Sequence, residues 1–196
     1  MKDSIYPQMK IIENNKYILR PICLEDATSM FEYYSQERVV RYLPIKVHKS
    51  IAETKRFIKK YFIENYKNGH ISHWAIIDKT NNKLIGNAGL NNISMKDKQG
   101  EIGICINPIY WGNDIASQIT KISLNYGFKY LNLEKIIAIT YEDNPSTKKS
   151  LENLGFKYVK TYNKRIKMSS ESKNVKCIRY EILRKDYILN RYLNWA

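Results

Sequence analysis

The chain has 196 residues, 43% of them hydrophobic and 27% charged, which is the balance of a globular protein and gives no sign of disorder. Its 33 Lys and Arg residues against 19 Asp and Glu residues give a net charge of +14 at pH 7, which argues against attraction of polycations such as polyamines. The basic residues are spread along the chain without an arginine-rich arm, and this favours a solvated basic surface over a nucleic-acid partner.

Cysteine usage and the ends of the chain bear on its location. The N-terminus, MKDSIYPQMK, has no apolar region of the kind found in secretory signals, and no run approaches the roughly 18 apolar residues of a membrane helix. Cys23, Cys105 and Cys177 are widely spaced and include no C-x-x-C pair. We therefore expect a cytoplasmic protein with neither a disulfide framework nor a metal site.

Residues 9–106 predict a hairpin, two helices and a meander of strands. Asp26 caps a first helix that ends near Gln36, and the capping box Ser50-Ile51-Ala52-Glu53 opens a second helix that ends near Tyr66. Apolar runs bounded by turn residues mark the strands, over 9–12, 17–20, 73–78, 84–90 and 97–106.

The chain is organised around residues 100–156. A short strand (GEIGICINP, 100–108) leads through a glycine-bearing turn (YWGNDIAS, 110–117) into an amphipathic helix, and a second strand follows over 135–141. Asn144 then caps a helix that has Pro145 at its first position and Gly155 just past its end. This order is a βαβ unit, whose first helix offers free backbone N–H groups and a positive dipole end to a phosphate-bearing ligand.

The remaining residues predict a terminal hairpin over 156–165 and 176–183, with a polar loop from Ser169 to Asn174, and a short closing helix from Asp186 to Trp195. No repeat, linker or low-complexity segment divides the chain. We therefore predict one domain in which helices cover both faces of a mixed sheet.

Four segments in register resemble the GNAT superfamily of N-acetyltransferases, and in particular the branch of the RimJ/RimL ribosomal-protein acetyltransferases and the spermidine acetyltransferases. They are LRPICLEDA (19–27), EIGICINP (101–108), YWGNDIAS (110–117) and EDNPSTKKSLENLGF (142–156). The resemblance covers about residues 9–186. It implies a single N-acetyltransferase domain over 1–196, with an α/β fold whose central twisted mixed sheet has about seven strands, is flanked by helices and is splayed between the fourth and fifth strands.

The resemblance also implies acetyl-CoA as co-substrate and no metal. The backbone of Ile104, Cys105 and Ile106 would pair with the pantetheine arm, and Asn144 and Thr147 would contact the arm and its mercapto end. The pyrophosphate would be held by the N–H groups of a turn made of Trp111, Gly112, Asn113, Asp114, Ile115 and Ala116. Asn144 is alternatively no more than a helix cap.

Asp114 departs from the family pattern, because it stands where relatives carry a glycine. Its carboxylate would repel a pyrophosphate at close range, unless the side chain turns outward and only the N–H faces the phosphate. Leu151 is a second departure. It replaces the tyrosine that serves some relatives as general acid, and so excludes a phenolic proton donor there.

Acetyl transfer to an amine needs a neutral nitrogen and a polarised thioester carbonyl. Glu101 is the candidate base, although an exposed carboxylate at a strand end is an equal interpretation. Thr147 and Ser150, together with Tyr141, provide hydroxyls that could relay a proton. Cys105 has no histidine partner in the sequence, which favours a buried structural cysteine over a covalent acetyl-cysteine.

The acceptor would lie against Tyr33, Tyr34 and Tyr42, with Glu101 beside it, although these aromatic residues would serve equally as core. We predict an N-acetyltransferase for a primary amine, either the α-amine of a ribosomal or other protein or a small amine, acting as a monomer or homodimer. One alternative is a polyamine or antibiotic N-acetyltransferase. The other is a non-catalytic protein of the same fold that binds acyl-CoA or nucleic acid.

Overall fold

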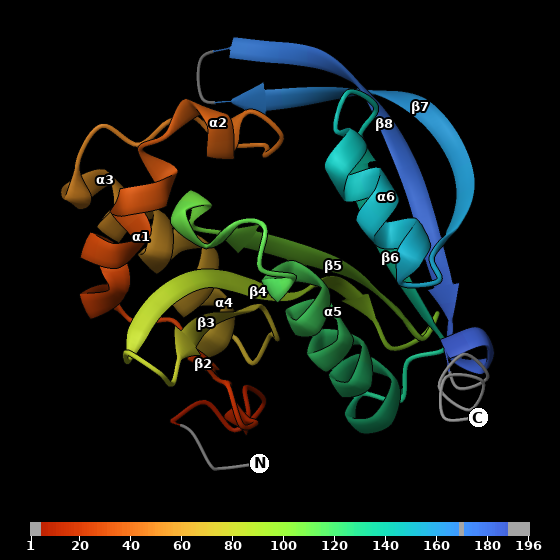
Figure 1. The fold of residues 1–196 in the computed structure, drawn as a ribbon, viewed down its shortest axis with the longest axis horizontal. Helices are drawn as coiled ribbons and strands as arrows, with labels where there is room; N and C mark the ends of the chain where they lie inside the picture. The colour runs from red at the N-terminus through yellow and green to blue at the C-terminus, as the bar shows by residue number, and fades with distance from the viewer. Residues whose placement is uncertain (1–4, 169–170, 188–196) are drawn as a thin grey trace. The chain divides into compact units, whose positions relative to one another are not determined.

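The computed structural model describes residues 5–168 and 171–187, in which strands and helices form a mixed α/β fold (Figure 1). The strands within these ranges form one sheet of eight, in the order β1-β2-β3-β4-β5-β6-β8-β7. β5 (Gln99–Ile106) and β6 (Lys135–Tyr141) are parallel, as the βαβ unit predicts, and α5 (Ile115–Asn125) lies between them in the chain. The sheet thus has one strand more than the predicted seven, and the predicted splay stays a prediction.

The chain divides into two compact units, Met1–Asn91 with Gly103–Ala116 (unit 1) and Asn92–Ile102 with Ser117–Ala196 (unit 2). Each unit takes in part of β4 (Lys83–Ser94), β5 or α5, so the boundary runs through regular elements rather than through a linker. The predicted single domain stays a prediction.

Unit 1 is an antiparallel meander with helices packed on it. Its strands are β1 (Ile12–Glu13), β2 (Tyr17–Pro21), β3 (His73–Asp78) and most of β4. Its helices are α1 (Ala27–Tyr34), α2 (Glu37–Val40), α3 (Ile51–Ile58) and α4 (Glu64–Lys67), with a π-helical segment over Lys59–Ile63. The core contains large side chains that are almost fully buried, including Trp74, Tyr33, Tyr66, Ile76 and Ile85.

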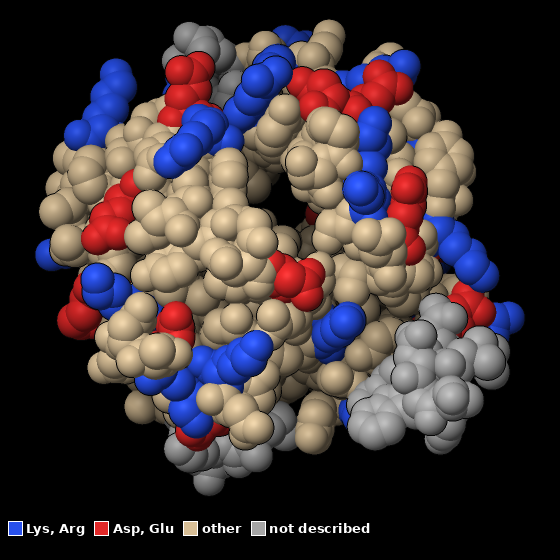
Figure 2. Space-filling view, in the orientation of Figure 1, with Lys and Arg blue, Asp and Glu red and all other residues tan. Residues whose placement is uncertain are grey.

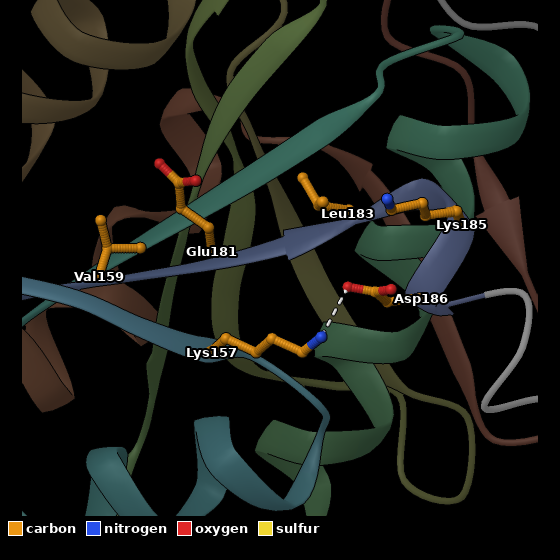
Figure 3. A pocket seen from close by; sticks show the side chains of 6 residues that line it. All are labelled: Lys157, Val159, Glu181, Leu183, Lys185 and Asp186. Atoms are coloured by element: carbon orange, nitrogen blue, oxygen red, sulfur yellow. Dashed lines mark hydrogen bonds and ion pairs between the residues drawn. The ribbon is translucent and has the colours of Figure 1, made fainter.

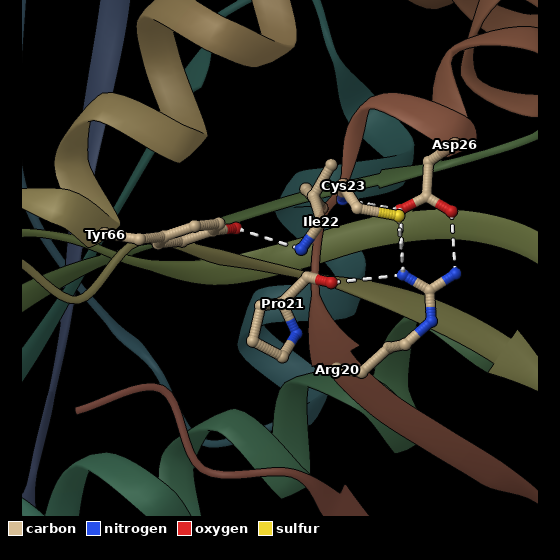
Figure 4. Close-up of polar contacts among 6 residues, drawn as sticks. All are labelled: Arg20, Pro21, Ile22, Cys23, Asp26 and Tyr66. Atoms are coloured by element: carbon tan, nitrogen blue, oxygen red, sulfur yellow. Dashed lines mark hydrogen bonds and ion pairs between the residues drawn. The ribbon is translucent and has the colours of Figure 1, made fainter. Parts of the chain in front are cut away.

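The start of α1 differs from the prediction that Asp26 caps this helix. A 3-10 turn, Leu24–Asp26, precedes α1, and the Asp26 side chain makes no capping bond to it. The carboxylate instead accepts from both terminal nitrogens of Arg20, at 2.8 and 2.7 Å, and from the Cys23 N–H at 2.9 Å (Figure 4). This two-point ion pair joins the end of β2 to the first turn of the helix.

The capping box before α3 is confirmed on one side. Ser50 Oγ accepts from the Glu53 N–H at 3.2 Å. The Glu53 carboxylate reaches one residue further back than predicted, because Oε2 accepts from the Lys49 N–H at 2.8 Å. Two orphan N–H groups are satisfied, and the helix starts where the sequence predicts.

Unit 2 contains the first half of β5, together with β6, β8 (Glu171–Leu183) and β7 (Lys157–Met168). α6 (Pro145–Asn153) lies across β6 and β8 in Figure 1. β7 and β8 pair from Lys157 with Glu181 to Met168 with Glu171, so the predicted polar loop from Ser169 to Asn174 is wrong for Glu171–Asn174, which lie in β8. The predicted closing helix lies outside the described residues after Tyr187.

Candidate functional site

The turn between β5 and α5 combines two backbone positions in the left-handed region. Gly112 has φ +83°, with no atom within 4 Å of where a Cβ would sit, and Asp114 has φ +55°. Residues 111–114 are exposed. Within the described part of the chain, the backbone N–H groups of residues 112–115 donate to no acceptor. The turn therefore presents several free donors ahead of an 11-residue helix.

Side chains of the turn hold its shape from within unit 1. The indole Nε1–H of Trp111 donates to the Ile106 carbonyl at 2.8 Å, although the side chain is 50% exposed. The Asn113 amide turns back and donates to the carbonyls of Tyr110 and Trp111, at 3.2 and 3.4 Å. The guanidinium of Arg38 lies over the Trp111 ring, 5.7 Å from its centroid, and brings a positive charge to the turn.

Asp114 places one carboxylate on this turn. It is exposed, and it accepts no hydrogen bond from any described residue. The Asp114 charge also affects Tyr17 in unit 1. Burial raises the pKa of Tyr17, and the negative charges of Asp78 and Asp114 raise it further. Asp and Asn tolerate φ > 0 better than other residues with a side chain, so the turn keeps a glycine-like backbone without a glycine.

The last residues of β5 are packed closely against β4. A Cβ on Gly86 would lie 2.3 Å from the Cys105 carbonyl oxygen, so only glycine allows this approach. Burial raises the pKa of the Cys105 thiol to about 12. A thiolate is therefore disfavoured, as expected of a structural cysteine. The Ile106 carbonyl is already engaged by Trp111.

Tyr33 and Tyr34 form part of a buried polar network in unit 1. Their hydroxyls donate to Asn87 Oδ1 at 2.9 and 3.0 Å. The Asn87 amide nitrogen faces His73 Nδ1 at 2.8 Å, and the Asn91 amide faces His73 Nε2 at 3.0 Å. Burial lowers the pKa of His73 to about 4. These positions agree with the alternative that the two tyrosines are core, and their role in acceptor binding stays a prediction.

Tyr42, the third predicted acceptor residue, is half-buried, and the Arg41 guanidinium lies 5.3 Å from the centroid of its ring. Glu101 belongs to unit 2, where it lies half-buried on β5 opposite Ile137 of β6. Its Oε2 accepts from the Asn92 amide at 3.1 Å. One carboxylate oxygen is thus held by a neutral donor, which fixes the side chain without neutralising its charge.

The start of α6 matches its prediction. Asn144 Oδ1 accepts from the Thr147 N–H at 3.2 Å, Pro145 occupies the first turn, and Gly155 has φ +88°. Thr147 and Ser150 are half-buried and lie one turn apart, on the side of the helix that also carries the buried Leu151. Burial raises the pKa of Tyr141, just before the helix, to about 12.

Comparison with known proteins decides the family. Residues 16–157 match the family model of the acetyltransferase (GNAT) domain. This chain belongs to the GNAT acetyltransferase family. It is 32% identical over 146 residues to the uncharacterized N-acetyltransferase YoaA of Bacillus subtilis (strain 168), covering 74% of this chain and 82% of YoaA. It is 25% identical over 138 residues to spermidine N(1)-acetyltransferase of Escherichia coli (strain K12), covering 70% of this chain and 71% of that enzyme.

Solved structures agree with this GNAT assignment. The ribosomal-protein-S5-alanine acetyltransferase of Vibrio fischeri has the same fold with a TM-score of 0.72 at 22% identity, over 91% of this chain and 98% of that one. The family and its named relatives identify the chain as an acyltransferase, and acetyl-CoA is the acetyl donor general to the GNAT family.

The GNAT turn is chemically suited to the diphosphate of acetyl-CoA. It carries free N–H donors, an open Gly112 and a nearby guanidinium, and its one carboxylate, on Asp114, is exposed. No cluster of three His, Cys, Asp or Glu side chains suited to a metal occurs in residues 5–168 and 171–187. None of the helices in the same ranges combines the length and apolar character that a membrane crossing requires.

Sequence reasoning missed several side chains that shape this GNAT site. Asn92, which holds Glu101, and Asn113, which holds the turn, carry no motif that marks them. Arg38 lies far from Trp111 in the chain, so no local pattern links the two. His73 reads as an isolated surface or packing residue in the sequence, and the buried network around it depends on strand pairing in β3 and β4.

Proposed function

We propose that this GNAT family member transfers the acetyl group of acetyl-CoA to a primary amine by direct attack of the amine, without an acyl-enzyme intermediate. The free N–H groups of residues 112–115 carry this proposal, because they suit a diphosphate and bind nothing within the described chain. Cys105 supports the direct route, since a buried thiol with a pKa of about 12 is a poor nucleophile near neutral pH.

In this proposal, three groups of residues bind the co-substrate. The N–H groups of Gly112, Asn113, Asp114, Ile115 and Ala116 take the diphosphate, and Trp111, whose own N–H donates to the Pro108 carbonyl at 3.1 Å and not to the ligand as expected, holds the start of the turn. The backbone of Ile104, Cys105 and Ile106 lies along the pantetheine arm. Asn144 and Thr147 lie near the mercapto end, and because Asn144 Oδ1 is used by the helix cap, its two amide N–H donors remain for the arm.

Glu101 is the proposed base. Asn92 fixes one of its carboxylate oxygens, and the other accepts the proton of the amine, directly or through water. Thr147 and Ser150 are the proposed proton donors to the leaving thiolate, and Tyr141, whose pKa of about 12 keeps it protonated, is a third. Leu151 has no proton to give. The site therefore has mainly to position the amine against the thioester and to remove one proton from the amine.

The acceptor amine is proposed to be an α-amine rather than a lysine side chain. Reference pKa values near 8 and 10.4 mean that neutralising a lysine amine costs about 3 kcal/mol more. A site with one carboxylate as its base therefore favours the α-amine, which loses its proton at the lower cost in free energy. The RimJ/RimL-like segments, and the name of the Vibrio fischeri structure, support an N-terminal α-amine of a cytoplasmic protein. The spermidine N(1)-acetyltransferase of Escherichia coli supports a small amine instead.

Acetyl-CoA binding tests the proposal through a matched pair of glycines. Gly112 and Gly69 both have positive φ, +83° and +76°, and at both the space that a Cβ would enter has no atom within 4 Å. Ala at either position strains the backbone to a similar degree without a clash, roughly 1 kcal/mol. We expect both variants to lose similar stability, and only Gly112→Ala to bind acetyl-CoA more weakly by isothermal titration calorimetry.

Thermal unfolding provides the second measurement. Acetyl-CoA at a hundredfold excess over its Kd should stabilise the wild-type chain by about 2.7 kcal/mol. Thiol release from acetyl-CoA, followed with a panel of peptides, polyamines and aminoglycosides, then identifies the acceptor class. An absence of stabilisation by acetyl-CoA would contradict the proposed function before any acceptor is tried.

A further inference from the structure

Nearly half of the net charge of the chain is concentrated in the β7–β8 hairpin. Residues 157–183 hold eight Lys or Arg residues and two acidic residues, a net charge of +6 out of +14. The face of the molecule in Figure 2 has Lys and Arg scattered among Asp and Glu, as the even spread in the sequence predicts. The hairpin departs from that spread, because pairing of two basic strands brings their cations together.

The strand register places Glu101 and several of these cations on the same face of the sheet in unit 2. Glu101 lies opposite Ile137, and Ile137 opposite Glu181. One row further along, Ile139 lies opposite Arg179, and Arg179 opposite Lys160. Directly opposed residues point to one face of a sheet, and so do residues two apart on a strand. Lys164 and Tyr162 therefore share the face of Glu101 and Lys160.

Helix α6 covers the other face. Tyr180 of β8 alternates with Arg179 and Glu181, and its hydroxyl donates to Glu152 of α6 at 2.9 Å. Tyr180 points to the face opposite Glu101, so this hydrogen bond to α6 lies on the face that Glu101 does not share. Around Glu181 the face of Glu101 is hollowed by a depression of about 250 Å³ lined by Lys157, Val159, Glu181, Leu183, Lys185 and Asp186 (Figure 3).

On this face, the cations near Glu181 and Asp186 are paired with carboxylates, and two lysines further along β7 are not. Lys157 pairs with Asp186 at 3.1 Å, and Arg179 and Lys135 both pair with Glu181, at 2.5 and 3.6 Å. Lys160 and Lys164, further along β7, are exposed and pair with no carboxylate among the described residues. An unpaired pair of lysines on the face of the candidate base attracts negative charge and repels positive charge.

We infer that the acceptor is a protein N-terminus followed by acidic side chains, with its α-amine at Glu101 and its carboxylates at Lys160 and Lys164. This inference rests on the proposed function and names its substrate class. From β5 to β7 there are three strand spacings, about 14 Å, and Lys160 and Lys164 lie about 7 and 20 Å further along the strands, so an extended peptide reaches Lys160 in about five residues and Lys164 in about seven. The acidic side chains therefore belong at about positions five to seven. A polyamine would meet two unpaired cations at the same place.

Single-stranded nucleic acid is the other polyanion to consider for this face, and the aromatic residues argue against it. Nucleic-acid platforms present free aromatic rings on which bases stack. Tyr141 and Tyr162 are instead packed against the buried cluster of Ile166, Val175 and Cys177. The Lys160 amine also lies 5.7 Å from the centroid of the Tyr162 ring. The carboxylates of an acidic peptide need only the lysine amines as partners. An acidic peptide therefore fits this face better than a single-stranded nucleic acid does.

The test compares three peptides that share one N-terminal sequence and carry Glu, Gln or Lys at positions five to seven. We expect kcat/KM from thiol release to be at least tenfold higher for the Glu peptide than for the Lys peptide, with the ratio falling as salt rises. The double variant Lys160→Gln/Lys164→Gln should bring the ratio close to one. Lys55→Gln/Lys59→Gln removes the same charge from exposed positions of unit 1 and should keep the ratio.

Three outcomes would overturn the inference. Equal rates for the three peptides would do so while the proposed function stands. If the Glu-to-Lys peptide ratio of kcat/KM fell equally in Lys160→Gln/Lys164→Gln and in Lys55→Gln/Lys59→Gln, the net charge of the protein, and not this face, would set the preference for acidic peptides. Competition by a single-stranded oligonucleotide that binds wild-type protein and not Lys160→Gln/Lys164→Gln would assign the face to nucleic acid. Acetyl-CoA binding without acetylation of any amine would instead contradict the proposed function itself.

Discussion

The indole N–H of Trp111 donates to the carbonyl oxygen of Ile106 at 2.8 Å, so the first residue of the candidate phosphate turn is bound to the last residue of β5. A half-exposed tryptophan is commonly taken to mark a surface that contacts a ligand or a partner. Here the indole N–H instead bonds to the backbone and closes the loop between Ile106 and Trp111. The turn is therefore held by an internal bond before any ligand arrives, and this pre-organisation favours binding.

Trp111→Phe should separate this bond from the aromatic contact. Phe keeps a ring under Arg38 and loses the N–H, which leaves the Ile106 carbonyl without this donor. We expect a loss of about 1 kcal/mol in the free energy of unfolding, measured with urea, and weaker acetyl-CoA binding by calorimetry. Arg38→Ala is the control, because it removes the cation and keeps the hydrogen bond. Unchanged affinity in Trp111→Phe would show that the turn needs no such tether.

Asp114→Gly should tighten acetyl-CoA binding. The change removes a negative charge beside the free N–H groups and relieves a residue with φ +55°. Asp114→Asn divides these two effects, since Asn removes the charge and still tolerates the left-handed backbone. If charge dominates, both variants bind more tightly by a similar factor in calorimetry. A weaker complex in both would show that the carboxylate contributes a contact to the ligand.

Local signals in the sequence predicted much of the fold. The apolar runs of β3 and β6 are bounded by turn residues, and their predicted ranges, 73–78 and 135–141, match the structure. The caps at Ser50 and Asn144 were also predicted, because capping depends on residues three apart. The π-helical segment Lys59–Ile63 was not, since nothing in its composition distinguishes it from the surrounding helix.

The parts that sequence could not predict depend on pairing between distant segments. The β7–β8 hairpin continues through residues whose polarity is typical of a loop, because its strands satisfy each other's backbone bonds regardless of side chain. The bond from Asn92 to Glu101 requires the turn after β4 to return along β5. Tyr33 and Tyr34 were predicted to lie either against the acceptor or in the core, and only the fold reveals that their hydroxyls share Asn87.

Asn144 allows the helix cap to be separated from a role in ligand binding. Asn144→Ala removes the acceptor for the Thr147 N–H and should cost about 1 kcal/mol of unfolding free energy. Asn144→Ser keeps a capping oxygen and should restore most of that stability, but it lacks the amide donors. We expect acetyl-CoA affinity to stay reduced in Asn144→Ser. Full recovery of affinity along with stability would reduce Asn144 to a cap.

Glu101→Gln should lower kcat far more than it changes acetyl-CoA affinity. Gln retains the shape and can still bond to Asn92, but it cannot take a proton, so a loss of about 10²- to 10⁴-fold in kcat is expected. Asn92→Ala provides the matched comparison, because it frees the carboxylate without removing it and should cost less. Steady-state kinetics with calorimetry measures both. Equal loss of turnover and acetyl-CoA affinity would remove Glu101 from the mechanism.

His73 predicts how the stability of the chain depends on pH. Asn87 Oδ1 accepts from two tyrosine hydroxyls, so its amide nitrogen donates to His73 Nδ1, and this ring nitrogen is unprotonated in the neutral ring. A second proton on Nδ1 would face a donor. Burial accordingly lowers the pKa of His73 from its ordinary value of 6.5 to about 4.

Between pH 6.5 and 4 the unfolded chain therefore binds a proton at His73 that the folded chain does not. The free energy of unfolding falls as the pH drops through this window, by up to roughly 1.4 kcal/mol per unit. His73→Gln should remove this part of the slope in urea unfolding at pH 7 and pH 5, at some cost in stability at both. The exposed His70 is the control, since His70→Gln leaves the network intact and should keep the wild-type difference. Identical slopes in His73→Gln and wild type would mean that the buried ring takes up its proton without disturbing the tyrosines around it.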